Sequence, residues 1–165
     1  MDLDLTSRTL EIGFGPGVAL GLLDRRVPKG SVTGIDPSRT MIRQAARRNL
    51  GAVKAGSVRL TRGVAGHLPY RDGSFDAVLS LNNILLWGPL GRGLREVWRV
   101  LRPGGQFVVA AHEWALRGQS APQHGDLAEV GPALEDSLAG AAFRDLRTEV
   151  IHLRIGRALL LTAFK

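Results

Sequence analysis

The segment LEIGFGPGVAL, residues 10–20, combines three glycines with a carboxylate. Gly13, Gly15 and Gly17 alternate with other residues directly after a short apolar run, and Glu11 stands two positions before the first of them. Glycine-rich turns between a strand and a helix let a ligand approach the backbone closely. A dinucleotide fingerprint spaces its glycines as G-x-G-x-x-G, whereas the third glycine here comes one place early. Glu11 would also repel a pyrophosphate, but it suits a ligand with an ammonium or sulfonium group.

Asp36 supplies a second carboxylate, roughly 20 residues after the glycines. It ends a predicted strand, where a carboxylate can accept hydrogen bonds from ribose hydroxyls. Glu11 and Asp36 together favour a nucleoside ligand that has a cationic end and no phosphates. S-adenosylmethionine has this composition, whereas NAD is a weaker candidate.

Alternating strands and helices would bring these residues together. Short apolar runs predict five strands, at residues 8–12, 31–35, 57–61, 75–81 and 106–111. Helices are expected over residues 36–49, where Ser38 can cap the helix, and over residues 127–139. The runs 146–155 and 157–165, joined by Gly156, predict a hairpin at the sheet edge. The pattern therefore predicts an α/β fold: a doubly wound, mostly parallel seven-stranded sheet with an antiparallel C-terminal hairpin, whose carboxyl edge carries the glycine loop.

The composition fits one globular domain over residues 1–165. The chain is 44% hydrophobic, contains no cysteine and has a formal net charge of +7. No apolar stretch reaches the roughly 20 residues of a membrane span, and the N-terminal residues lack an export signal, so a cytoplasmic protein is expected. The lack of cysteine excludes disulfides, thiolate metal sites and cysteine nucleophiles, and no metal site is predicted.

Arginines carry most of the positive charge. Two series recur at helical spacing, one at Arg39, Arg43 and Arg47 and one at Arg92, Arg95, Arg99 and Arg102, the second opposed by Leu94, Val97, Trp98 and Leu101. We expect solvated helix faces rather than a nucleic-acid surface, because no aromatic residues lie between the arginines as stacking platforms.

Four segments resemble motifs of the class I S-adenosylmethionine-dependent methyltransferases, particularly the small-molecule branch that includes quinone-biosynthesis enzymes. They are LEIGFGPG, GIDPSRTM, LPYRDGSFDAVLSLNNILLW and LREVWRVLRPGGQFVVA, in the family's order between Leu10 and Ala111. The resemblance implies a Rossmann-like fold, with S-adenosylmethionine as cofactor and S-adenosylhomocysteine as product.

The resemblance also implies which residues bind the cofactor. They are Glu11, Gly13, Gly15, Gly17, Asp36, Pro37, Met41, Val64, Ala65, Ser80, Leu81 and Asn82. Val64 stands where many relatives have an aspartate for the adenine amino group, so adenine recognition would rest on backbone groups near Val64 and Ala65.

Methyl transfer chiefly requires alignment and exclusion of water, but a hydroxyl or acidic carbon as acceptor needs a base. His112, at the end of the strand 106–111 and beside Glu113, is the best-placed candidate, although a strand-end histidine with only a structural role would look the same.

Asn82 and Asn83 would contact the cofactor or substrate, or cap the following turn. Trp87 and Trp114 would line an apolar pocket or belong to the core, and His67 would flank the cofactor or lie exposed in its loop. His124 and His152 show no partner in the sequence.

Three functions fit these patterns. The first is methyl transfer to a small molecule. The second is methylation of RNA, and the third is a cofactor-binding module that needs a partner chain for catalysis. Family members usually carry helices before the first glycine motif that fold over the substrate, and few residues precede it here. We therefore expect a site that is open unless a homodimer, a partner chain or the segment 117–126 covers it.

Overall fold

Five parallel strands form the larger part of the sheet in the computed structural model, which describes residues 1–117 and 127–165. They are β1 (Arg8–Ile12), β2 (Ser31–Asp36), β3 (Val58–Arg62), β4 (Phe75–Leu81) and β5 (Leu101–His112). The prediction of these strands is confirmed, although β5 begins five residues earlier than expected. A bulge between Phe75 and Ala77 accommodates the longer β5 against β4.

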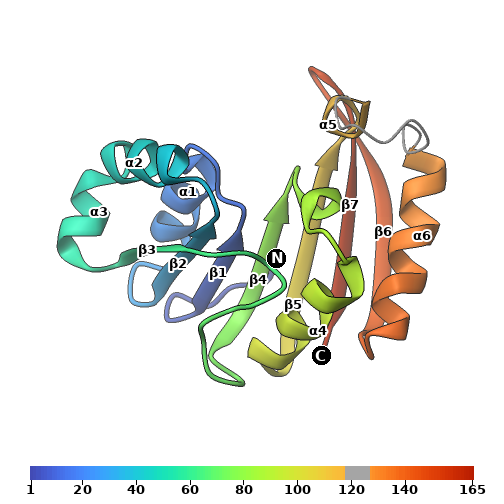
Figure 1. Ribbon diagram of the computed structural model, residues 1–165, viewed down its shortest axis with the longest axis horizontal. Coiled ribbons are helices and arrows are strands. Elements are labelled where there is room, and N and C mark those ends of the chain that lie inside the picture. Colours follow the sequence, from blue (N-terminus) through green and yellow to red (C-terminus); the bar gives the residue numbers. More distant parts are fainter. Residues whose placement is uncertain (118–126) are drawn as a thin grey trace.

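Two antiparallel strands complete the sheet, β6 (Arg144–Leu153) and β7 (Gly156–Phe164). The strand order is β3-β2-β1-β4-β5-β7-β6, with β7 antiparallel to both of its neighbours (Figure 1). The predicted fold class is thereby confirmed. Of the two hairpin strands, β6 forms an edge of the sheet, because β7 lies between β5 and β6.

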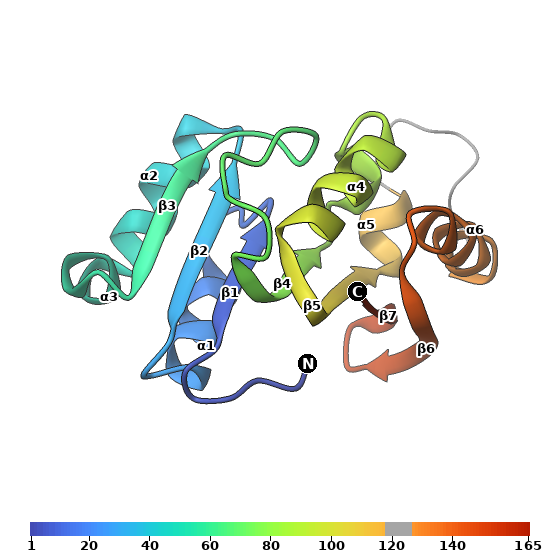
Figure 2. The same ribbon diagram turned by 90° about the horizontal axis from the view of Figure 1, so that it is seen from below.

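Helices cover both faces of the sheet (Figure 2). They are α1 (Val18–Arg26), α2 (Arg39–Arg48), α3 (Leu50–Ala55), α4 (Leu90–Val100), α5 (Glu113–Arg117) and α6 (Leu127–Gly140), with a 3₁₀ turn η1 (Ile84–Leu86). One core cluster joins Leu20 and Leu23 of α1 to Val32 and Val58 of the sheet. The other packs α4 and α6 against the opposite face. No helix among residues 1–117 and 127–165 is long and apolar enough to cross a membrane.

The two arginine series differ from one another in the structure. Arg39, Arg43 and Arg47 lie exposed on α2, as expected. The prediction for the second series is wrong in part, because α4 ends at Val100 and Arg102 belongs to β5. Trp98 is also 37% exposed rather than buried with Leu94 and Val97, since one residue further along a helix turns a side chain about 100° away from that face.

The connections create a switch point beside β1. From β1 the chain runs to β2 and β3 on one side and then crosses to β4 and β5 on the other. In open α/β sheets, ligands bind at the carboxyl ends of the strands beside such a reversal. The loop that follows β1, residues 13–17, lies there.

Candidate functional site

The glycine loop presents bare backbone at the end of β1. Gly13 has φ 70° and its N–H donates to Ile35 O at 2.7 Å. A Cβ on Gly13 would lie 2.6 Å from Asn83 Cγ, whereas one on Gly15, at φ 52°, would meet nothing within 4 Å. Gly13 is therefore required by close packing as well as by its left-handed backbone, and Gly15 borders open space.

Asp36 ties the glycine loop to the end of β2. Its Oδ2 accepts from the N–H of Gly15 at 3.0 Å and its Oδ1 from the N–H of Ser38 at 2.8 Å. The carboxylate is only 6% exposed. Each oxygen still has a lone pair with which to accept from a ligand hydroxyl. Ser38 in turn caps α2, as predicted, by accepting from the N–H of Met41 at 3.3 Å.

Glu11 is a buried carboxylate with an unsatisfied oxygen. The residue is 2% exposed, and Oε2 has no hydrogen-bond partner among the described residues. Burial, together with the negative charge of Asp36, raises the pKa of Glu11 to about 8. A buried carboxyl without a partner is costly to ionise, so this position favours a cationic ligand group that would compensate the charge.

A cavity of about 750 Å³ opens at this edge of the sheet. Of the predicted cofactor residues, those that line it are Gly13, Gly15, Asp36, Pro37, Val64, Ala65, Leu81 and Asn82. Its lining also includes residues that sequence reasoning did not select, namely Ile12, Ile35, Gly63, Gly66, Leu86, Gly88, Pro89 and Arg92. The volume suits a nucleoside-sized ligand.

Four predicted residues lie outside the lining: Glu11, Gly17, Met41 and Ser80. Gly17 sits against α2, where its carbonyl accepts from Asn49 Nδ2 at 2.9 Å. Met41 is half-buried in the first turn of α2. Ser80 is fully buried and donates to Asn83 Oδ1 at 3.2 Å. Gly17 and Ser80 thus hold the residues that line the cavity rather than lining it themselves.

Asn83 connects the glycine loop with the segment after β4. Its Nδ2 donates to Gly13 O at 3.2 Å and to Leu81 O at 2.8 Å. Its Oδ1 accepts from Trp87 Nε1 at 2.7 Å as well as from Ser80. The amide is therefore fully used within the protein, so Asn83 shapes the site. Trp87 lines the cavity and also packs against core residue Phe107, with ring centroids 6.1 Å apart.

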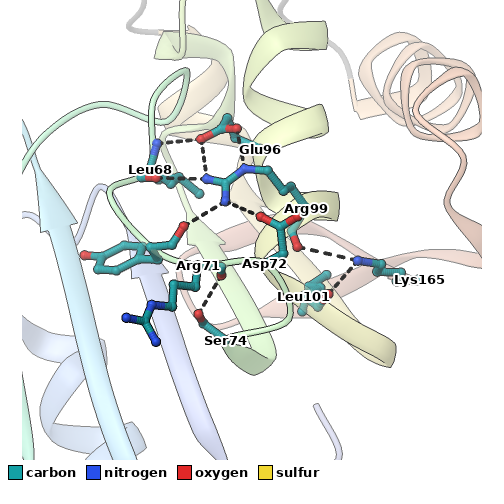
Figure 3. A network of polar contacts seen from close by, with 9 residues as sticks. Leu68, Arg71, Asp72, Ser74, Glu96, Arg99, Leu101 and Lys165 are labelled. Atoms are coloured by element: carbon teal, nitrogen blue, oxygen red, sulfur yellow. Dashed lines mark hydrogen bonds and ion pairs between the residues drawn. The ribbon is translucent and has the colours of Figure 1, made fainter.

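A polar network holds the segment 63–74, whose first residues line the cavity (Figure 3). Arg99 donates to the carbonyls of Leu68 at 2.9 Å and Tyr70 at 2.7 Å, and to Asp72 at 2.8 Å. Glu96 pairs with Arg99 and accepts from the N–H of Leu68 at 2.7 Å. The Arg99 guanidinium is also the main cause of the lowered pKa of Glu96. The expected solvated position of Arg99 is thus wrong, because its side chain fastens this segment to α4.

His112 ends β5 and contacts Asn82. Its backbone N–H donates to Asn82 Oδ1 at 2.7 Å, and its ring Nδ1 lies 3.2 Å from the same oxygen. The ring is stacked at a tilt beside the exposed Trp114, 5.7 Å between centroids. His112 does not line the cavity, whereas His67 does. His152 is exposed on β6, and His124 and most of the segment 117–126 lie outside the described residues.

Residues 10–109 match the family described as "Methyltransferase domain". The chain belongs to this family, the class I S-adenosylmethionine-dependent methyltransferases.

Two curated relatives and one solved structure illustrate the similarity. The "Uncharacterized methyltransferase YdaC" of Bacillus subtilis is 36% identical over 100 residues, which cover 61% of this chain and 53% of that protein. The "Demethylmenaquinone methyltransferase" of Deinococcus radiodurans is 38% identical over 102 residues, 62% of this chain and 42% of that protein. The crystal structure of the cyclase SpnF superposes with a TM-score of 0.81 at 25% identity and covers 99% of this chain and 76% of that one. This chain therefore spans about half the length of the curated relatives it matches.

Proposed function

We propose that this domain binds S-adenosylmethionine and transfers its methyl group to a small molecule. The observation that carries the proposal is the unpartnered, buried carboxylate of Glu11 behind a glycine loop that Asp36 fastens. In the described part of the chain, the cavity lining contains one Lys or Arg, Arg92, which lies beside Gly66 rather than at the glycine loop. A cationic ligand end suits this distribution better than a pyrophosphate.

When bound, S-adenosylmethionine supplies a methyl group on a positively charged sulfur. Gly13 and Gly15 would let the ligand approach the backbone, and Asp36 would accept from ribose hydroxyls. Ile35, Val64 and Ala65 offer an apolar wall for adenine. Leu81 and Asn82 would face the methyl end, and His112 beyond them is the proposed base. The small-molecule acceptor is supported by the name of the menaquinone relative. The fold alone does not establish methyl transfer, since the cyclase SpnF has a similar fold.

Calorimetry with S-adenosylhomocysteine and with NAD tests the proposal. We expect binding of the first ligand and none of the second. Asp36→Ala should weaken binding roughly thirtyfold, because two ribose hydrogen bonds to a charged acceptor are lost. Asp24→Ala, on α1 and outside the cavity lining, is the control. Tight NAD binding without S-adenosylhomocysteine binding would overturn the proposal. An unchanged affinity of Asp36→Ala would show that the ribose does not bind at Asp36.

A second candidate, methylation of RNA, is supported by the distribution of charge. Residues 37–71 contain eight Lys and Arg and no Asp or Glu, so the rest of the chain has a net charge of −1. All eight side chains are exposed. Most of them belong to α2, α3 and β3, which lie together at one end of the molecule (Figures 1 and 2).

A titration with single-stranded RNA separates the two candidates. If RNA is the substrate, affinity should fall steeply between about 50 and 200 mM salt. A triple change of Arg39, Arg43 and Arg47 to Gln should reduce that dependence, whereas the same change at Arg144, Arg147 and Arg154 should not. No measurable binding at low salt would remove this candidate.

A homodimer or partner chain that covers the site stays a prediction, which light scattering with and without ligand would check.

A further inference from the structure

Asn82 belongs both to the cavity wall and to the surroundings of His112. It follows β4 with φ 58°, a left-handed conformation that asparagine tolerates better than most residues. Its N–H donates to Ala110 O at 2.8 Å, which anchors it to β5. Its side chain reaches His112, while the residue lines the cavity. Asn82 is thus the structural link between the ligand site and the histidine.

The contacts of Asn82 determine which way its amide points. The backbone N–H of His112 lies 2.7 Å from the amide atom that faces it, and an N–H can only donate. That atom must therefore be the oxygen, Oδ1. The amide nitrogen, Nδ2, therefore does not face the His112 N–H. It has no hydrogen-bond acceptor within residues 1–117 and 127–165, so it is available to a ligand oxygen.

The same oxygen determines the tautomer of His112. Ring Nδ1 lies 3.2 Å from Oδ1, and two hydrogen-bond acceptors cannot bond to each other. Nδ1 must carry the proton in the neutral ring, which leaves the lone pair on Nε2. No group in the described residues bonds to Nε2. Glu113, the neighbouring carboxylate, is instead paired with Arg157 at 2.8 Å. Nε2 of His112 is therefore the open proton acceptor at this end of β5.

We propose that Asn82 is a positioning residue that fixes His112 with Nε2 as proton acceptor. We also propose that the methyl acceptor is a hydroxyl-bearing molecule, because an acceptor oxygen, unlike an acidic carbon, can accept from Asn82 Nδ2 as well as lose its proton to Nε2. This inference rests on the proposed function and names its substrate class. In the transfer, the acceptor oxygen forms the new O–C bond, the electron pair of the broken S–C bond stays on sulfur, and the hydroxyl proton passes to Nε2. A thioether has no such proton to give up, so it would gain nothing from this histidine.

Nuclear magnetic resonance of the ¹⁵N-histidine-labelled chain tests the tautomer without any ligand. We expect His112, assigned by loss of its signals in His112→Gln, to carry its proton on Nδ1. Asn82→Gly keeps the left-handed backbone unstrained and removes the amide, so it should shift His112 toward the other tautomer. The signals of His67 and His152 serve as internal controls, and circular dichroism checks the fold. An Nε2-protonated His112 in the wild type, or a tautomer unchanged in Asn82→Gly, would overturn the inference.

Activity provides the second readout. With a panel of phenols as acceptors and S-adenosylmethionine at saturation, so that a change in cofactor affinity does not enter the result, Asn82→Gly should lower kcat about tenfold. Equal turnover of phenols and thioethers, or none with any phenol, would overturn the acceptor class. Failure of the wild type to bind S-adenosylhomocysteine would instead overturn the proposed function, and the tautomer measurement would be unaffected by that result.

Discussion

Glu11 is the residue whose state couples the site to pH. Its pKa is about 8 in the folded protein, against an ordinary value of 4.5. Between these two pH values the folded protein holds a proton that the unfolded chain has lost. The group therefore contributes its full stability below pH 4.5, and this contribution is lost as the pH rises toward 8.

Glu11→Gln should remove this dependence. Relative to the variant, the wild type should lose on the order of 2 to 4 kcal/mol of unfolding free energy between pH 5 and pH 8. Urea unfolding at several pH values measures it. Asp24→Asn is the control, because Asp24 is only partly buried. Its stability should change with pH as that of the wild type does. Parallel pH profiles for wild type and Glu11→Gln would contradict the raised pKa.

Ligand binding should release the same proton. A cationic ligand group near Glu11 favours the carboxylate, so binding at pH 7 converts a neutral side chain into a charged one. Calorimetry with S-adenosylhomocysteine in buffers of different ionisation enthalpy should report about one proton released at pH 7 and almost none at pH 9. Glu11→Gln should release none and bind more weakly. Identical heats in all buffers at pH 7 would speak against this role for Glu11.

The sequence predicted the individual residues of the site better than their contacts. Glu11, Asp36 and the glycines stand in a local pattern, so their place at one sheet edge could be predicted. Asn83 and Arg99 could not be assigned their roles, because the groups they bond lie 70 residues away at Gly13 and 31 residues away at Leu68. A helical series of arginines looks the same in sequence whether its members are solvated or paired.

At the scale of elements, α4 contains a matched pair of glycines. A Cβ on Gly93 would lie 2.7 Å from Trp87 Cε3 and 3.5 Å from Ala65 Cβ, inside the wall of the cavity. Gly91 is exposed on the same helix. Gly93→Ala should destabilise the protein by about 1–3 kcal/mol through overpacking, and Gly91→Ala should stabilise it by roughly 0.5–1 kcal/mol. Thermal unfolding of both variants measures the contrast, and equal shifts would contradict this packing.

Arg99 fastens the segment 63–74 to α4, and its loss should loosen the part of the cavity wall that this segment forms. Arg99→Lys keeps the charge but cannot reproduce the fork of hydrogen bonds, so we expect a loss of about 2 kcal/mol in stability. Hydrogen exchange at the Leu68 amide, which donates to Glu96, should accelerate. Arg95→Lys, exposed on α4, is the control. Unchanged exchange across residues 63–74 would show that other contacts hold the segment.

The elements themselves followed from patterns that are local. Strands at β1 to β5 and the β6–β7 hairpin were predictable because each is a short apolar run bounded by turn residues. The insertion of β7 between β5 and β6 was not, since the strand next to β5 is decided by which apolar face fits it. Leu159 and Leu161 of β7 are nearly fully buried, whereas β6 is mostly exposed. The more apolar strand therefore takes the inner position.

At the scale of the whole molecule, this arrangement predicts the effect of shortening the chain. Without residues 156–165, β6 has no described partner strand and β5 presents an unpaired edge along Gln106–His112. An exposed apolar edge strand invites pairing with another molecule. We expect a chain of residues 1–155 to aggregate on refolding from urea while the full chain refolds without aggregating. Light scattering measures the difference, and a monodisperse 1–155 chain would contradict it.

The position of β7 also orders events during synthesis. The ribosome synthesises β1 to β5 first and then β6. The last strand, β7, lies between β5 and β6 in the sheet. The half of the sheet that carries Glu11, Asp36 and the glycine loop is complete by the end of β5, so it can assemble while the remainder is still being translated. β6 and the free edge of β5 both pair with β7, so neither can complete its pairing until the last residues of the chain have left the ribosome. We therefore expect the nascent chain to expose the edge of β5 until β7 is available, and a chaperone would bind at that edge.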